Sequence, residues 1–178
     1  MKINTVELND HLVLHYTVRR SVLGLVLVAA TSKGVAAVLL GDAKSSLLAD
    51  LQARYPQAQL VKGGEVLDRW SDTVLEILAH PCLEHLVPLD LVHSTEFQRK
   101  VWKALRSIPS GQTRSYSELA KAIGSPQAVR AVASACGANP LAVLVPCHRV
   151  LRSDGRLGGY RWGLERKLKL LELEETFL

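Results

Sequence analysis

Three short apolar runs near the start of the chain constrain its fold more than any other feature. They occupy residues 12–18, 22–29 and 35–40, and brief polar breaks separate them. Apolar runs of this length that alternate with turn-forming residues are typical of strands joined by hairpins. We therefore predict an antiparallel meander of three strands.

Two helices are predicted to follow, over residues 45–55 and 65–79. Both segments carry apolar side chains at the three- and four-residue intervals of a helix, and Pro56 ends the first. The two apolar faces consist of Leu47, Leu48, Leu51 and Tyr55, and of Val66, Leu67, Trp70, Val74, Leu75 and Leu78. Prolines then interrupt the pattern at 81 and 88. We therefore predict one domain over residues 1–90 and a second over 91–178.

The second domain is predicted to be mainly helical. Thr95 with Gln98, and Ser115 with Glu118, fit the capping box, which satisfies unpaired N–H groups at a helix start. The first of these helices ends at Pro109 and Gly111. The apolar positions of the two helices are Phe97, Val101, Leu105 and Ile108, and Leu119, Ala120 and Ile123.

A third helix is expected over about residues 126–137, with Ser125 as its cap and Pro126 in its first turn. Together with the helix after Ser115 and the turn at Gly124, it forms a helix-turn-helix candidate. Arg130 of this helix is either a solvated charge or a DNA contact. Its small side chains, among them Ala131 and Ser134, suit close approach to a groove.

An apolar run at 141–145 lies between two prolines. We expect it to be extended, buried and to end at the chemically active residues. A polar loop at 152–155 and the turn Gly158-Gly159-Tyr160 follow. The final helix is predicted over about 163–175, with a packing stripe of Leu164, Leu168 and Leu171 and with Glu174 at its edge.

Composition and charge restrict the class of protein. Only 22% of residues are charged and 48% are hydrophobic, which favours a packed core over disorder. No apolar stretch approaches the length of a membrane span, and the N-terminus lacks the apolar core of a secretory signal. The three cysteines, Cys82, Cys136 and Cys147, include no close pair. We therefore expect a cytosolic protein without disulfides, metal or other cofactor.

The charges are unevenly distributed. Residues 1–93 hold 8 Lys/Arg against 10 Asp/Glu, a net of −2, whereas residues 94–178 hold 14 against 7, a net of +7. A basic half is the footprint expected of a polyanionic partner. A solvated basic surface explains the charge alone equally well.

Cys147 is the strongest candidate for chemistry. Positive charge beside a cysteine favours the reactive thiolate, and His148 and Arg149 follow Cys147 directly. Adjacent side chains rarely touch, so a proton would pass from Cys147 to His148 through a bridging water. A carboxylate behind the imidazole would orient it, and Glu172, Glu174 and Glu175 are all candidates. Tyr116 is either a packing aromatic or a phenol donor.

Five segments in order along the chain resemble the O6-alkylguanine-DNA alkyltransferases. They are Ser-Tyr at 115–116, Ala-Val-Arg-Ala-Val at 128–132, Gly-Ala-Asn-Pro at 137–140, Val-Pro-Cys-His-Arg-Val at 145–150 and Gly-Gly-Tyr at 158–160. Residues 130–136 and 159–163 look most like the C-terminal methyltransferase domain of bacterial adaptive-response (Ada) proteins. The resemblance runs from about residue 89 to 174. It implies an α+β fold: a ribonuclease H-like N-terminal domain and a winged-helix-like C-terminal domain.

The resemblance also implies a reaction and a partner. A monomer in the bacterial cytosol or nucleoid would bind double-stranded DNA through the minor groove and flip out a damaged nucleotide. Cys147 would then take the alkyl group from guanine O6, or a methyl group from thymine O4. The product would be a thioether, which has no leaving group that would regenerate the thiol, so each molecule would act once.

Individual roles are implied for the residues that match the family. Glu174 would hold His148, which would deprotonate Cys147. Tyr116 would rotate the flanking phosphate and protonate guanine, and Arg130 would fill the gap in the base stack. Asn139 would brace the turn before the active site. The guanine edge would be read by the backbone of Cys147 and Val150 and by the loop at Tyr160 and Arg161, while Trp162 at the rim would exclude large alkyl groups.

Three alternatives stay open. An alkyltransferase-like protein would bind damaged DNA without transferring anything, but such proteins lack the reactive cysteine. A helix-turn-helix regulator would leave Cys147 unexplained. A cysteine hydrolase would need a direct base, and no second histidine is suitably placed in the sequence.

Overall fold

A computed structural model describes residues 12–80, 87–91 and 93–176. Strands β1 (Val13–Ser21), β2 (Gly24–Ala30) and β3 (Val35–Gly41) form the predicted antiparallel meander. A fourth strand, β4 (Gln59–Lys62), lies parallel to β1 and gives the order β3-β2-β1-β4. β4 was not predicted from the sequence, because its four residues are at most partly buried and carry too little periodic pattern.

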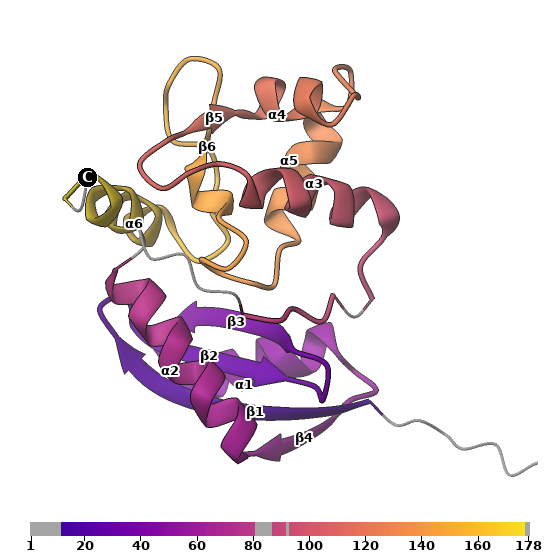
Figure 1. The fold of residues 1–178 in the computed structure, drawn as a ribbon, viewed down its shortest axis with the longest axis vertical. Helices are drawn as coiled ribbons and strands as arrows, with labels where there is room; N and C mark the ends of the chain where they lie inside the picture. The colour runs from indigo at the N-terminus through magenta and orange to yellow at the C-terminus, as the bar shows by residue number, and fades with distance from the viewer. Residues whose placement is uncertain (1–11, 81–86, 92, 177–178) are drawn as a thin grey trace, which may run out of the picture.

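Both predicted helices of the N-terminal part are present, as α1 (Lys44–Arg54) and α2 (Glu65–Ala79). In the view of Figure 1, α2 crosses in front of the sheet and α1 lies behind it. Nearly every residue of β2 and β3 is buried, as expected for strands covered on both faces. Leu67, Val74 and Leu78 of the predicted α2 face are buried, and Trp70 and Leu75 are half-buried.

The outer edge of β3 joins the two halves of the chain. Val35 N donates to Pro88 O (2.8 Å) and Val38 N donates to Pro140 O (2.8 Å). Asp90 N and Ala142 N donate back to Val35 O and Val38 O. An exposed strand edge is thereby satisfied, and the segment that leads to Cys147 is fixed against the sheet.

The C-terminal part packs above this edge in Figure 1. It contains α3 (Glu96–Arg106), β5 (Arg114–Ser115), α4 (Tyr116–Ala122), α5 (Val129–Gly137), the 3-10 turn η1 (Cys147–Arg149), β6 (Val150–Leu151) and α6 (Leu164–Thr176). β5 and β6 pair in parallel. The capping boxes at Thr95 and Ser115 are both confirmed.

The start of α5 differs from the expectation. The helix begins at Val129, and its cap residue, Ala128, makes no side-chain capping bond. Ser125 and Pro126 instead belong to a separate turn closed by Ala128 N donating to Ser125 O (2.9 Å). The predicted capping by Ser125 was therefore wrong. Proline suits the second position of a turn as well as it suits the first turn of a helix.

The apolar run 141–145 is buried, as predicted, but it is not extended. Val145 N donates to Leu141 O (3.0 Å), Leu144 N donates to Ala142 O (2.7 Å), and Val143 has a φ of 59°. The chain thus turns back on itself before Pro146. An apolar run indicates burial, whereas its conformation here follows from pairing with β3 at one end and from the site at the other.

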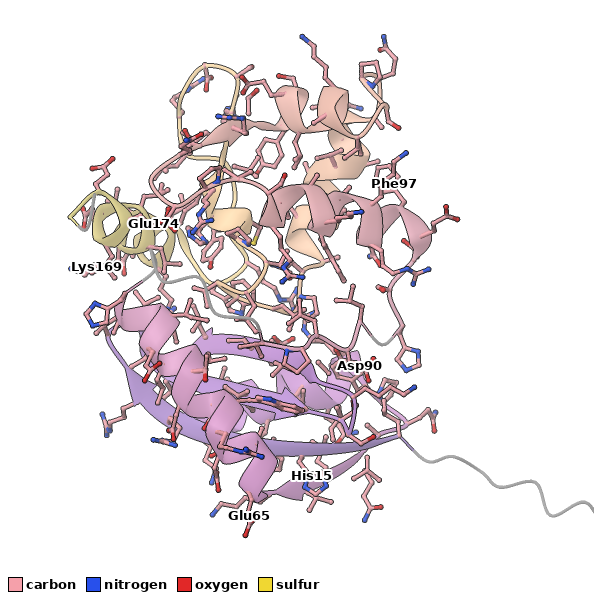
Figure 2. All side chains as sticks on the ribbon, viewed as in Figure 1. His15, Glu65, Asp90, Phe97, Lys169 and Glu174 are labelled. Carbon is pink, nitrogen blue, oxygen red and sulfur yellow. The ribbon has the colours of Figure 1, made fainter. Side chains whose placement is uncertain are left out.

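The packing face of α6 also differs from the predicted stripe. Leu164 and Leu168 are 50% and 47% exposed, whereas Lys167, Leu170 and Glu174 are fully buried. Figure 2 shows Glu174 directed toward the rest of the C-terminal part and Lys169 directed away from it. Leucine periodicity selected the wrong face because the inner face of this helix carries two charged side chains.

None of the helices in the described part of the chain combines the length and apolarity that a membrane span requires.

The corrected helix face predicts contrasting costs for two leucines of α6. Leu170→Ala leaves a cavity in the core and should lower the free energy of unfolding by about 2–5 kcal/mol. Leu168→Ala should change it by less than about 0.5 kcal/mol, because its side chain is half exposed. Urea unfolding of both variants measures the difference, and equal losses would contradict the assigned face.

Candidate active site

Cys147 lies at the start of η1 against a pocket of about 480 Å³. The wall of the pocket is built from α5, from Tyr116 at the start of α4 and from the loop that includes Gly158, Tyr160 and Arg161. Cys147 is 5% exposed, so the sulfur is reached through the pocket rather than from the open surface. Both described cysteines, Cys136 and Cys147, are free and line this pocket, and Cys82 lies outside the described residues.

Asn139 fixes the approach to the cysteine. The side chain is fully buried just beyond the end of α5. Its oxygen accepts from Leu141 N (2.9 Å), and its Nδ2 donates to Val145 O (2.8 Å) and to Cys147 Sγ (3.2 Å). One amide thus closes the turn over 141–145 and points a donor at the sulfur.

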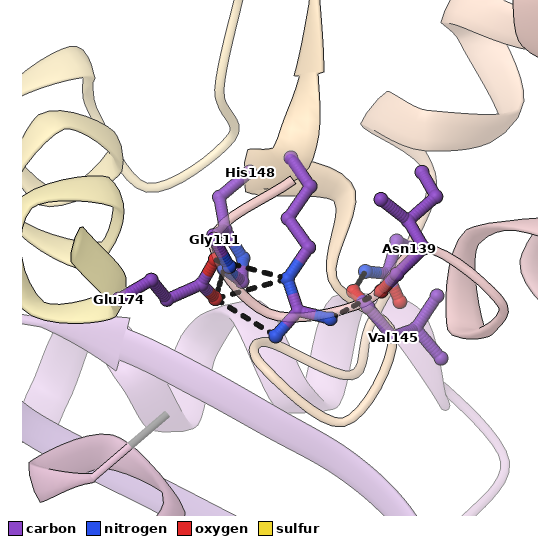
Figure 3. A network of polar contacts seen from close by, with 7 residues as sticks. Gly111, Asn139, Val145, His148 and Glu174 are labelled. Atoms are coloured by element: carbon purple, nitrogen blue, oxygen red, sulfur yellow. Dashed lines mark hydrogen bonds and ion pairs between the residues drawn. The ribbon is translucent and has the colours of Figure 1, made fainter. Parts of the chain in front are cut away.

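Glu174 is the carboxylate that meets His148. Its Oε1 lies 2.8 Å from His148 Nε2, and both side chains are buried. Arg149 donates to the same carboxylate from Nε (2.9 Å), and Gly111 N donates to it (3.1 Å), as Figure 3 shows. Arg149 also donates to Ile108 O (2.6 Å). Glu172 and Glu175 are exposed, so among the three candidate glutamates the fold selects Glu174.

The His148–Glu174 pair is arranged to accept a proton. Burial lowers the pKa of His148, so the imidazole is neutral near neutral pH. Burial opposes ionisation of Glu174, but hydrogen bonds from His148 and Arg149 outweigh it and lower the pKa of that carboxyl. An ionised Glu174 requires the proton of His148 on Nε2, which leaves Nδ1 as the acceptor. Nδ1 is buried and has no hydrogen-bond partner in the described part of the chain.

The thiol of Cys147 is not a thiolate at rest. Burial raises its pKa to about 11, although the hydrogen bond from Asn139 and the charge of Lys167 act in the opposite direction. Positive charge from the neighbouring His148 and Arg149 was expected to favour a thiolate. Both side chains instead turn to Glu174.

Tyr116 faces the same pocket as a hydrogen-bond donor. Burial, together with the neighbouring Cys136 and Cys147, raises the pKa of its phenol to about 12, so the hydroxyl keeps its proton. A side chain at position 158 would collide with it: a Cβ on Gly158 would lie 2.7 Å from the Tyr116 ring and hydroxyl. Glycine at 158 is therefore required for Tyr116 to occupy this place.

The two faces of α5 separate DNA candidates from pocket residues. Arg130, Ala131 and Ser134 are exposed, whereas Ala133 and Cys136 of the same helix line the pocket. The structure therefore brings Cys147, His148, Glu174, Tyr116 and Asn139 together. It places Arg130, Ala131 and Ser134 on the outer surface beside them.

Trp162 and Val150 lie behind the pocket wall. Trp162 is buried, is not a wall residue, and packs edge-on against Tyr160 with ring centroids 5.2 Å apart. Any effect of Trp162 on pocket size is therefore transmitted through Tyr160. The backbone of Val150 was expected to help read the guanine edge, and its carbonyl accepts a hydrogen bond from Lys167 Nζ (2.6 Å).

Lys167 is a buried residue near the pocket that was not predicted from the sequence. The side chain is fully buried and also donates to Gly158 O (3.4 Å), so it links β6 to the loop that lines the pocket. Its position three residues before Leu170 and seven before Glu174 is the helical signal that could have revealed it. The described residues contain no group of three or more His, Cys, Asp or Glu suited to holding a metal.

Comparisons with known proteins agree with this geometry. The family model for the 6-O-methylguanine DNA methyltransferase, DNA binding domain, matches residues 96–176. The chain is 46% identical over 165 residues to the bifunctional transcriptional activator/DNA repair enzyme Ada of Escherichia coli. The matched region covers 93% of this chain and 46% of Ada. It therefore spans about half the length of that relative.

Two further relatives match over most of their own length. The inducible methylated-DNA–protein-cysteine methyltransferase of Bacillus subtilis is 40% identical over 151 residues, which is 83% of each chain. The crystal structure of Mycobacterium tuberculosis O6-methylguanine methyltransferase superposes with a TM-score of 0.75 at 36% identity, over 93% of this chain and 94% of that one. The chain therefore belongs to the O6-methylguanine-DNA methyltransferase family.

Proposed function

We propose that this protein repairs alkylated DNA by transferring a methyl or other alkyl group from guanine O6 to Cys147. The observation that carries the proposal is a buried thiol at a pocket, next to the Asn139 amide and the His148–Glu174 pair. A methylated-DNA–protein-cysteine methyltransferase is also what the Bacillus subtilis relative is named.

Binding to double-stranded DNA is proposed through α4 and α5. The outer face of α5 combines small side chains with the exposed Arg130, which suits entry into a groove. The pocket behind this helix has a volume of about 480 Å³, enough for a single base. Chemistry on a base requires that the base leave the stack, and a damaged base that pairs weakly leaves most readily. Arg130 would then occupy the vacated position.

The transfer is a single displacement in which every proton has a destination. The thiol proton of Cys147 passes through water to His148 Nδ1, while Glu174 holds the imidazole and stabilises its charge. The sulfur forms a bond to the alkyl carbon as the bond from that carbon to guanine O6 breaks. Tyr116 donates a proton to a guanine ring nitrogen and later recovers one from solvent. The product is a thioether on Cys147, so the protein is consumed.

We also propose a division into domains over residues 1–90 and 91–178, and action as a monomer in the bacterial cytosol at the nucleoid. The sheet with α1 and α2 and the helical part with the site occupy these two ranges. The site side chains named above all come from the second range.

Stoichiometric transfer to Cys147 tests the proposal. Incubation with a duplex that carries labelled methyl on guanine O6 should place one label per protein on Cys147, as located by peptide mass spectrometry. Cys147→Ala should bind the lesion and take up no label, because the acceptor is missing. Multiple turnovers, or label on Cys136, would contradict the proposal. Lesion binding without transfer would identify a binding protein, and preference for a DNA sequence over a lesion would identify a regulator.

The pKa of Cys147 predicts how the free protein reacts with iodoacetamide. Below a pKa of about 11 the thiolate fraction rises about tenfold per pH unit, so the alkylation rate of Cys147 should rise similarly from about pH 7 to pH 9. Asn139→Ala removes a hydrogen bond that lowers this pKa and should slow alkylation at each pH. A wild-type alkylation rate that is constant over this pH range would show a preformed thiolate and would contradict the raised pKa of Cys147.

A further inference from the structure

Asp50 of α1 reaches across the molecule to the edge of the pocket. Its Oδ1 lies 2.7 Å from Arg161 Nη2, although the two residues are 111 positions apart in the sequence. Arg161 belongs to the wall of the pocket, whereas Asp50 belongs to the N-terminal part. The carboxylate of one half of the chain thus pairs with a pocket residue of the other half.

The carboxylate of Asp50 also pairs with a second arginine, Arg54. Arg54, one helical turn along α1, donates from Nε to Asp50 Oδ1 (3.3 Å). Arg54 Nη1 also donates to the carbonyl of Ala138 (3.4 Å), just beyond α5 and directly before Asn139. Asp50 therefore connects α1 both to the pocket wall and to the segment that carries the amide donor of Cys147.

The part of the wall that Arg161 belongs to has no regular secondary structure and is held by contacts such as the bond from Arg166 Nη1 to Trp162 O (2.9 Å). Residues 158–163, here called the rim segment, form neither helix nor strand and include three glycines. Glycine loses more conformational freedom than other residues when a chain is ordered, so such a segment is costly to hold in one shape. Lys167 holds Gly158 at its start, and Asp50 holds Arg161 near its middle.

We propose that Asp50 is a positioning residue for the transfer reaction: through Arg161 it holds the rim segment in the shape that completes the pocket. This inference rests on the proposed function. A pocket that is ordered before the base enters spends less of the binding free energy on ordering, and small misplacements of such a wall slow the chemical step. The N-terminal part would thereby contribute to the site without touching the reacting atoms.

The Asp50–Arg161 ion pair is expected to contribute little to the free energy of unfolding. The side chains of Arg161 and Asp50 are 34% and 30% exposed, and partly exposed pairs contribute little to folding. Loss of the pair should therefore appear in the rate of transfer and in the mobility of the rim segment, with little change in melting temperature.

The test compares Asp50→Asn with Asp72→Asn, which breaks the exposed Arg19–Asp72 pair far from the pocket wall. At saturating lesion DNA, Asp50→Asn should lower the single-turnover rate of methyl transfer about fivefold, within the range for a coupled pair, and leave the Kd for undamaged DNA unchanged. Asp50→Glu should restore the rate. Asp72→Asn should match the wild type.

Two further measurements assign the effect to Arg161. Arg161→Gln should also slow transfer, and the double variant Asp50→Asn/Arg161→Gln should be no slower than Asp50→Asn alone, because Asp50→Asn already removes the partner of Arg161. Amide hydrogen exchange of the rim segment in the free protein should be faster in Asp50→Asn than in the wild type. This measurement requires no substrate, so it separates the present inference from the proposed function.

The inference is overturned by additive effects in the double variant, by unchanged exchange in the rim segment, or by a wild-type rate in Asp50→Asn. A slower rate that coincides with a lower melting temperature and is not restored by Asp50→Glu would indicate a structural role only and would also overturn it. If the wild type transfers no label, the proposed function fails, and the exchange measurement alone decides whether Asp50 orders the rim segment.

Discussion

The site depends on the hydrogen bonds that the buried carboxylate of Glu174 accepts inside the C-terminal part. A charge removed from water is costly unless donors surround it, and here His148, Arg149 and Gly111 all donate to it. These donors come from η1 and from the loop between α3 and β5, while Glu174 comes from the last helix. The carboxylate therefore fixes the direction of η1, and with it the place of Cys147.

This arrangement separates the protection of the thiol from its activation. Burial raises the pKa of Cys147 to about 11, which keeps the free protein in its less reactive protonated form. His148 is neutral and oriented by Glu174, so the proposed base is already held in place in the free protein. Under the proposed single-use reaction, a thiol that stays protonated at rest would limit loss of the free protein to unrelated reactions.

Much of the fold could be predicted from local pattern. The meander, α1, α2 and both capping boxes follow from apolar spacing and from residue pairs three positions apart, which are local properties. The errors fall where distant contacts decide: β4 exists through pairing with β1, and the run at 141–145 turns because β3 and Asn139 hold it. On α6 the leucines indicated the wrong face, because Lys167 and Glu174 are buried by partners far away in the sequence.

The sequence by itself identified Cys147 as the candidate nucleophile and indicated the family, because the residues around Cys147 are unusual neighbours for a core cysteine and occur with the other segments in the order that the family resemblance requires. Only the tertiary structure decided which glutamate holds His148, that the thiol is protonated at rest, and that Asp50 reaches Arg161. Spacing along a chain can place residues on one face of a helix. Burial, protonation and pairing across more than a hundred residues depend on how the elements pack against each other.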